Sequence, residues 1–454
     1  MWIRSALSLL LLLGLAPAAL GQEVRGTVGT HARWEGEITL KDAVTVAPGA
    51  LLTIAPGTRI RPAHADAVIA VQGRLMIRGT AERPVVFSRT AGWKGIEFFE
   101  SRGESSIEHA RFEGAETAIS ALASSFAVSR GSFKECGTAI KLLREATLTV
   151  EDSQFANNQV GVDNQMKSRA TLRRNRFSGH RETAILVTHN STGLIEGNHF
   201  ENNRQGIAAI QKFPGRILGN TFRANKTAIF CNQTQATPLI RDNLFEKNEN
   251  ALVNLSFAYP AVESNRFLDN ASAIRNDQFG SPRVIHNQFR GNGMALFNNR
   301  KSNPQVEKNQ LENNRTAIFC DYSSYPQVRA NNFRGNAMAV KLGIYQSADW
   351  EKRSGSKAIM AKSAAERNSQ NPLLAKAPTS FTDQVDVSGN WWGEQTADLV
   401  RAGKGGNLAF FHDRLDQPEV SYEGFGPGKY RLDQIVFAPW LEAEVPDAGP
   451  EKRP

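Results

Sequence analysis

The sequence contains a repeat of about 22 residues, which we call a coil, and a row of phenylalanines marks it. The row consists of Phe112, Phe133, Phe155, Phe177, Phe200, Phe222, Phe245, Phe267 and Phe289, continued by Leu311 and Phe333. An aliphatic residue lies five positions before every member, and another lies seven positions after nearly every member. A fixed period sustained over eleven coils is typical of a solenoid, in which equivalent positions stack on one another.

The apolar positions within a coil form short clusters and not a helical pattern. Each cluster spans one to three residues and is rich in β-branched or aromatic side chains, which favours strands. A leucine-rich repeat has a similar period but requires a denser leucine pattern than this chain contains. The repeat therefore predicts an all-β fold, a right-handed parallel β-helix of about 22 residues per coil, with coils about 4.8 Å apart.

Asparagines form two further rows in phase with the phenylalanines. One row lies two positions before the phenylalanine row: Asn175, Asn198, Asn220, Asn243, Asn265, Asn287, Asn309 and Asn331. The other lies three positions after it: Asn158, Asn203, Asn225, Asn248, Asn270, Asn292, Asn314 and Asn336. Asparagine tolerates left-handed turns and, when stacked, bonds to its equivalents in neighbouring coils. We therefore interpret both rows as structural.

The same repeat predicts the state of the three cysteines. Cys231 and Cys320 share one phase but lie four coils apart, about 19 Å at the coil spacing. A disulfide requires Cα atoms within about 7 Å, and Cys136 has another phase. We expect three free thiols, mostly buried. Because the histidines share no phase that brings three of them together and the methionines form no cluster, we expect no metal site and no cofactor.

Segments outside the repeat set the predicted domain boundaries. An apolar run at residues 7–20 follows Arg4 and ends in small residues, which predicts a signal peptide over residues 1–21. The other predicted parts are a β-helix over residues 22–344, an insertion over 345–384 with a helix or mobile loop at 356–367, a closing coil and cap over 385–442, and a disordered tail over 443–454. Trp392 takes the phenylalanine position in the closing coil.

The charge pattern narrows the classes of partner. The net charge is +9, but the basic residues are scattered and never form a run of five, which argues against nucleic-acid binding. The apolar run is about 14 residues long and is short for a membrane span. We expect an exported monomer, periplasmic or extracellular, with no membrane span after signal cleavage.

Several motifs of short strands and turns lie near the two ends of the repeat. They include Thr45-Val46-Ala47-Pro48-Gly49, Leu52-Thr53-Ile54-Ala55-Pro56-Gly57-Thr58, Trp93-Lys94-Gly95-Ile96, Asn390-Trp391-Trp392-Gly393 and Val436-Phe437-Ala438-Pro439-Trp440-Leu441. Over residues 34–441 the chain resembles secreted bacterial right-handed parallel β-helix repeat proteins with pectin-lyase-like folds. The resemblance implies the fold and not one function, because the group includes lyases, glycosidases, epimerases, carbohydrate-binding modules and the periplasmic copper-maturation protein of nitrous-oxide reductase.

Candidate site residues lie in the strand that follows the second asparagine row. Its outward positions should form columns of aromatic and polar side chains along the rod. The candidates are Phe230, Asn232, Arg275, Asp277, Phe297, Asn299, Arg300, Phe319, Asp321 and Tyr322. Aromatic rings there would cover sugar faces while Asp and Asn bond hydroxyl groups. The pattern favours non-enzymatic binding or scaffolding at the cell envelope, with polysaccharide as the ligand class.

Two other functions stay open at this point. A polysaccharide-active enzyme (hydrolase, lyase or epimerase) would use Asp277 and Asp321 as acid and base, and about 9.6 Å along the axis is near the upper limit for an inverting glycosidase. A periplasmic metalloenzyme-maturation factor would require clustered His, Met or Cys residues, which the repeat does not bring together.

Overall fold

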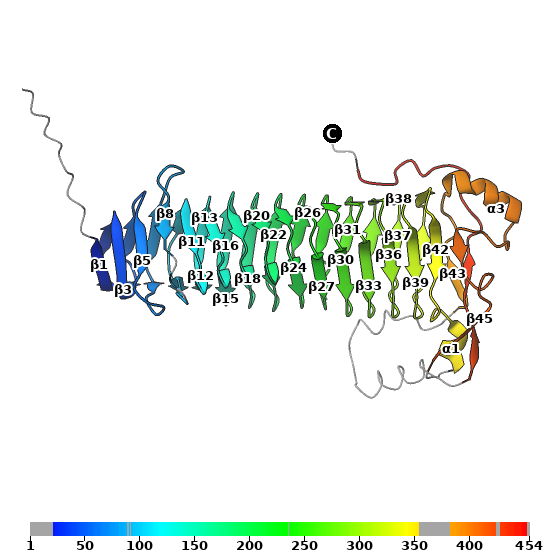
Figure 1. Ribbon diagram of the computed structural model, residues 1–454, viewed down its shortest axis with the longest axis horizontal. Coiled ribbons are helices and arrows are strands. Elements are labelled where there is room, and N and C mark those ends of the chain that lie inside the picture. The colour runs from blue at the N-terminus through cyan, green and yellow to red at the C-terminus, as the bar shows by residue number, and fades with distance from the viewer. Residues whose placement is uncertain are drawn as a thin grey trace, which may run out of the picture.

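A computed structural model describes residues 21–88, 90, 92–234, 236–353, 382–423 and 427–451. In it the chain winds into a long rod of stacked parallel strands, with the two ends of the repeat at opposite ends of the rod (Figure 1). A 14-stranded sheet forms one face, and a 29-stranded sheet contains the other strands of the coils. The predicted parallel β-helix is confirmed.

Each regular coil contributes three short strands, which form three rows. The first row is β2 (His31–Trp34), β4 (Leu51–Ile54), β7 (Arg74–Arg78), β10 (Ser105–Glu108), β13 (Ser125–Ser129), β16 (Thr147–Glu151), β19 (Arg169–Arg173), β22 (Thr192–Glu196), β25 (Arg216–Leu218), β28 (Leu239–Arg241), β31 (Ala261–Glu263), β34 (Arg283–Ile285), β37 (Gln305–Glu307) and β40 (Gln327–Arg329). The second row contains the phenylalanines and is β5 (Arg59–Pro62), β8 (Val85–Phe87), β11 (Ala110–Glu113), β14 (Ser132–Lys134), β17 (Gln154–Ala156), β20 (Arg176–Ser178), β23 (His199–Glu201), β26 (Thr221–Arg223), β29 (Leu244–Glu246), β32 (Arg266–Leu268), β35 (Gln288–Arg290), β38 (Gln310–Glu312) and β41 (Asn332–Arg334).

The third row completes each coil. It is β6 (Ile69–Val71), β9 (Ile96–Phe99), β12 (Thr117–Leu122), β15 (Thr138–Leu143), β18 (Val160–Asn164), β21 (Thr183–Val187), β24 (Gln205–Ile210), β27 (Thr227–Asn232), β30 (Asn250–Leu255), β33 (Ser272–Asp277), β36 (Met294–Asn298), β39 (Thr316–Cys320), β42 (Met338–Leu342) and β44 (Phe411–His412). At the N-terminal end, β1 (Gln22–Val28) pairs with β3 (Glu37–Val46), and β3 pairs in turn with both β5 and β6.

The phenylalanine row forms a continuous stack inside the rod. Consecutive rings from Phe87 to Phe289 are parallel, with centroids 4.4 to 5.0 Å apart, and all are almost fully buried. Leu311 and Phe333 continue the row in register, and Trp392 stacks on Phe333 at 4.4 Å. This register follows from strand alternation, since a slip of one residue would turn every ring outward.

The two asparagine rows form hydrogen-bonded ladders at the turns. In the first ladder, the Oδ1 atom of Asn265 accepts the backbone N–H (2.9 Å) and a side-chain N–H (2.9 Å) of Asn243. Its Nδ2 group donates to the carbonyl oxygens of Ile240 (2.8 Å) and Glu263 (3.0 Å) and to Asn287 Oδ1 (3.0 Å). The ladders therefore satisfy buried turn groups, and their structural interpretation is confirmed.

The three cysteines are free and buried, as predicted. Burial raises the pKa of Cys136 to about 11 and the pKa of Cys231 and Cys320 to about 12, because an apolar interior disfavours the thiolate. Each thiol therefore remains protonated and unreactive at neutral pH.

The C-terminal end of the rod is closed by elements outside the repeat. These are α1 (Ala348–Arg353), β43 (Gln384–Asp386), η2 (Gly393–Gln395), α3 (Thr396–Ala402), β45 (Glu419–Ser421), β46 (Lys429–Arg431) and β47 (Gln434–Val436). Strands β43 and β47 pair in parallel, and β45 and β46 are antiparallel. A cap of this kind covers the open edge that a solenoid would otherwise expose.

Two predicted segments lie outside the described residues: the signal peptide, apart from Gly21, and the helix or loop at 356–367. The disordered tail predicted over 443–454 is wrong for residues 443–451, which run back along the rod (Figure 1). Its acidic side chains form ion pairs with Arg334, Lys308 and Arg241, and these contacts hold it. Among the described helices, none is long and apolar enough to cross a membrane.

Candidate functional site

The sequence-predicted site residues lie on the outer surface of the third strand row and in the turns that follow it. Strand pairing places Phe230, Val253, Arg275, Phe297, Phe319 and Lys341 in one column. A second column contains Asn232, Leu255 and Asp277, and Asn299 and Asp321 continue it with the same ladder of backbone hydrogen bonds. The predicted register is therefore confirmed.

We use the name outer strip for the part of these columns that is continuous. The outer strip comprises Arg275, Asp277, Phe297, Asn299, Arg300, Phe319, Asp321, Tyr322 and Lys341. Phe230 and Asn232 lie two coils before Arg275 and Asp277, and the aliphatic residues Val253 and Leu255 separate them from the outer strip. The structure therefore does not bring all ten predicted residues together.

The aromatic residues of the outer strip stack along the rod axis. The rings of Phe297 and Phe319 are parallel with centroids 5.1 Å apart, and the guanidinium of Arg275 lies 4.5 Å from the centroid of Phe297. Arg275 covers one face of Phe297 and Phe319 covers the other. Phe297 therefore does not offer the open ring face that the sequence suggested for a sugar, and its contribution is a ring edge between Arg275 and Phe319.

Asp277 is held by a neighbouring arginine. Its two carboxylate oxygens each accept a hydrogen bond from Arg300 at 2.5 Å, in the bidentate geometry that makes such pairs strong. One oxygen also accepts the backbone N–H of Gln278 at 2.8 Å and the side chain of Asn299 at 3.4 Å. The side chain is buried and its oxygens are engaged, so it is not arranged as a free catalytic acid or base.

Asp321 lies two coils further along the same column and has a different environment. One of its oxygens accepts the backbone N–H groups of Tyr322 (3.0 Å) and Tyr345 (2.8 Å). Burial raises its pKa to about 6, because desolvation of the carboxylate outweighs these two hydrogen bonds. An acid of this kind can exchange protons near neutral pH. Asp277 does not complement it as a second catalytic carboxylate, since Arg300 occupies that group.

A stack of tyrosines extends the outer strip onto the cap. Tyr322 stacks on Tyr345 with centroids 4.3 Å apart, Tyr345 on Tyr422 at 4.7 Å, and Tyr422 on Tyr430 at 5.2 Å. Arg353 lies over Tyr430 at 4.5 Å. Sequence reasoning missed the last three tyrosines because they belong to segments without the period, so no phase links them to Tyr322.

A short polar stack lies inside the rod beneath the outer strip. Asn254 donates to Asn276, and Asn276 to Asn298, both at 2.9 Å, and all three are fully buried. The Nδ2 group of Asn298 lies 3.9 Å from the sulfur of Cys320. The sequence did carry a signal for this stack, because all three asparagines share the phase of Cys231 and Cys320, nine positions after the phenylalanine row.

A metal ion would require several of the described side chains to converge as ligands. Within the described ranges, no three His, Cys, Asp or Glu side chains are grouped as metal ligands would be. His180 is buried and bonded to Asn203, and burial lowers its pKa to about 4. The cysteine thiols are buried in separate coils. A copper site, which needs converging nitrogen or sulfur ligands, does not fit these residues.

Two family models match the chain. Residues 92–267 match a model described as a right-handed beta helix region, and residues 215–368 match one described as periplasmic copper-binding protein (NosD). Comparisons with curated proteins and with solved structures give no match. The two matched segments together span most of the regular coils, and the strand pairing agrees with the first description. The chain is therefore a right-handed parallel β-helix repeat protein related to the NosD family.

Proposed function

We propose that this protein is a non-enzymatic β-helix protein of the periplasm that binds an extended acidic polysaccharide along the outer strip. The family match is to periplasmic proteins, which agrees with the export predicted from residues 1–21. The observation that carries the proposal is the in-register column of Arg275, Phe297, Phe319 and Lys341. Both cationic ends of this column are exposed to solvent.

A polymer suits such a surface better than a small molecule does. Equivalent positions recur at each coil, about 4.8 Å apart, so successive units of a polymer can each contact one position of the column. Arg275 and Lys341 supply positive charge, while Asn299 and Asp321 supply hydrogen-bonding groups beside them. Acidic sugars are the units that this combination complements.

Binding without turnover follows from the states of the two carboxylates. The bidentate contact with Arg300 keeps Asp277 engaged, whereas a glycosidase needs both carboxyl groups free to face the scissile bond. Copper binding, which the description of the related family includes, is not part of the proposal, because the described residues form no suitable ligand cluster.

A glycan array probed with the full chain tests the proposal, followed by calorimetric titration of any ligand found. The Arg275→Ala/Lys341→Ala double variant should bind at least tenfold more weakly, about 1.4 kcal/mol, since two charge-assisted contacts are lost. Arg290→Ala is the matched control, because Arg290 is an exposed arginine in β35 of the second strand row and lies off the outer strip.

Two results would contradict the proposal. One is equal affinity for the wild type and the double variant. The other is release of reducing ends or unsaturated sugars by the wild type but not by Asp321→Asn, which would assign turnover to this surface.

A further inference from the structure

The C-terminal tail, residues 444–451, occupies a groove along the turns between the first and second strand rows. Asn332 holds the tail backbone through Val445, accepting its N–H at 2.9 Å and donating to its carbonyl oxygen at 2.9 Å. Lys308 pairs with the carboxylate of Asp447 at 2.7 Å, and His286 bonds to the carbonyl oxygen of Asp447 at 2.8 Å. Further ion pairs join Glu444 to Arg334 and Glu451 to Arg241.

The tail crosses the coils nearly along the rod axis (Figure 1). Its partners descend from Arg334 in β41 to Arg241 at the end of β28, four coils or about 19 Å, while the tail advances seven residues. Seven fully extended residues would reach about 23–25 Å, so the tail follows the axis with a turn in its path. The groove therefore binds an acidic peptide that runs along the rod axis and contains one turn, closed by a hydrogen bond from the N–H of Ala448 to the carbonyl oxygen of Val445 (3.2 Å). The ends of three successive coils supply the amide, the cation and the imidazole that hold it.

The same three positions of the repeat carry the same chemistry near the N-terminal end. Asn332 lies one position before Phe333, and Gln154 lies one position before Phe155. Lys308 and Arg130 both lie three positions before their row members, Leu311 and Phe133. His286 and His109 likewise lie three positions before Phe289 and Phe112. Each set spans three consecutive coils in the same order.

The backbone conformations of the two sets also agree. The φ angles of Lys308 and His286 are +54° and +57°, and those of Arg130 and His109 are +52° and +47°. All four residues therefore occupy left-handed turn positions of the same kind. Equivalent turns in a regular solenoid project their side chains in the same direction, so the N-terminal set has the geometry with which the other set holds the tail.

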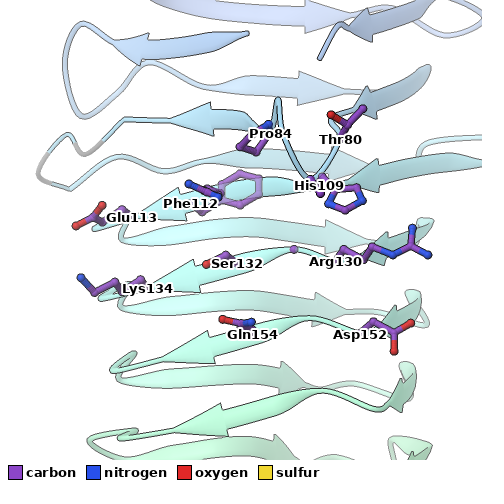
Figure 2. A pocket seen from close by; sticks show the side chains of 13 residues that line it. Thr80, Pro84, His109, Phe112, Glu113, Arg130, Ser132, Lys134, Asp152 and Gln154 are labelled. Carbon is purple, nitrogen blue, oxygen red and sulfur yellow. The ribbon is translucent and has the colours of Figure 1, made fainter. Parts of the chain in front are cut away.

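The N-terminal set lines an open groove of about 530 Å³, with Gln154 and Ser132 on its floor and His109, Arg130 and Asp152 along one side (Figure 2). The loop with Thr80 and Pro84 closes its far end. We use the name N-terminal groove for this site.

Two arginines of the N-terminal groove, Arg111 and Arg130, have no ion pair among the described residues. Asp152 is held by Arg174 through contacts of 2.8 and 3.1 Å, which lower its pKa, and Lys134 lies 3.3 Å from Glu135. Arg130 forms no ion pair with any side chain in the described part of the chain, and neither does Arg111. Arg130 helps to lower the pKa of Asp152, but that carboxylate is already held by Arg174. Arg130 therefore presents a guanidinium without an ion pair of its own at the position where Lys308 holds a carboxylate.

We propose that the N-terminal groove binds an acidic peptide segment of a partner protein. The peptide lies along the rod axis as the tail does. Arg130 holds an Asp or Glu side chain, Gln154 bonds to the peptide backbone two residues before it, and His109 bonds to a peptide carbonyl oxygen. A partner is favoured over the chain's own tail, because that tail is already bound about eight coils away.

A fluorescent peptide with the sequence of residues 442–451 tests the proposal in trans against the full-length protein. We expect saturable binding, measured by fluorescence anisotropy, that weakens as salt is raised. Arg130→Glu should reduce the affinity at least tenfold. Lys308→Glu is the matched control, since it makes the same charge change at the equivalent position of the occupied groove, and it should leave peptide binding unchanged. Circular dichroism of both variants should show an unchanged fold.

Three outcomes would overturn the proposal. The first is that the wild type binds no peptide up to millimolar concentration. Loss of binding in Lys308→Glu but not in Arg130→Glu would place the peptide in the other groove. Concentration-dependent dimerisation that Arg130→Glu abolishes, measured by analytical ultracentrifugation, would assign the groove to the tail of a second copy and not to a partner.

Discussion

The coils before Asn158 and the coils from Asn158 to Asn336 share one phenylalanine stack but satisfy their turns differently. In the earlier coils a serine hydroxyl accepts one backbone N–H, as Ser153 does from Gly131 (2.9 Å) and Ser124 from Ser101 (2.9 Å). In the later coils each ladder asparagine makes up to five bonds, as Asn265 does. The phenylalanine stack therefore sets the register throughout. The asparagines supply hydrogen-bond partners to buried turn groups whose register is already defined.

The two regions also differ in what covers the groove along the turns between the first and second strand rows. The later coils are covered by the chain's own tail, and in the earlier coils the equivalent groove is open. A solenoid can thus repeat a binding geometry along its length and use it differently at each end.

The largest expected effect is on the asparagine ladder. Asn265→Ala should lower the free energy of unfolding by about 3 kcal/mol or more, because it leaves several buried backbone and side-chain groups without a partner. Urea denaturation followed by circular dichroism measures the loss. Ser153→Ala, at the equivalent position of the earlier coils, should cost about 1 kcal/mol. Equal losses for the two variants would remove the distinction between the regions.

The outer surface of the later coils should respond to pH through Asp321. Its pKa is raised from 3.8 to about 6, so the folded chain holds this proton more tightly than the unfolded chain does. Its contribution to stability is therefore present below about pH 4 and is lost as the pH rises through about 6, by about 2 kcal/mol for this partly exposed group.

Thermal unfolding of Asp321→Asn and of the wild type between pH 4 and pH 7.5 isolates this contribution. The difference between the two proteins should shift in favour of the variant as the pH rises. The comparison is needed because Asp433, buried in the cap, also has a pKa raised to about 6 by burial. A difference that does not change with pH would contradict the assigned environment of Asp321.

A smaller effect is expected where the two regions meet. Ser153 donates its backbone N–H to Asn175 Oδ1, so it occupies the position that would extend the first ladder by one residue. Ser153→Asn should raise the free energy of unfolding by about 1 kcal/mol, since the new amide can bond to Asn175 and to the carbonyl oxygen of Val128. A lower melting temperature would show that the earlier coils do not accept the ladder geometry.

The smallest expected effect is the absence of thiol reaction in the native state. Cys136 in the earlier coils and Cys231 and Cys320 in the later coils are all buried with raised pKa values, so a disulfide-exchange reagent at pH 8 should label none of them. Denaturant should expose all three. Rapid labelling of Cys136 alone would indicate that the earlier coils open more readily.

Much of the fold was predictable because it depends on positions that recur once in every coil. The phenylalanine register, both asparagine ladders, the free cysteines and the position of Trp392 each follow from one period. The column from Arg275 to Lys341 was predictable for the same reason. The pairing of Asp277 with Arg300 was not, since it depends on the direction of a long side chain in a turn.

The sequence by itself determined how the coils stack, because burying one aromatic ring per coil leaves a single register in which every ring faces inward. Only the tertiary structure decided which carboxylates are free and what covers each groove. Those contacts join the repeat to segments that lack its period, such as Asp447 on Lys308 and Tyr345 beside Asp321. Nothing in the spacing of residues specifies where such a segment lies, whereas charge and hydrogen bonding in the folded chain do.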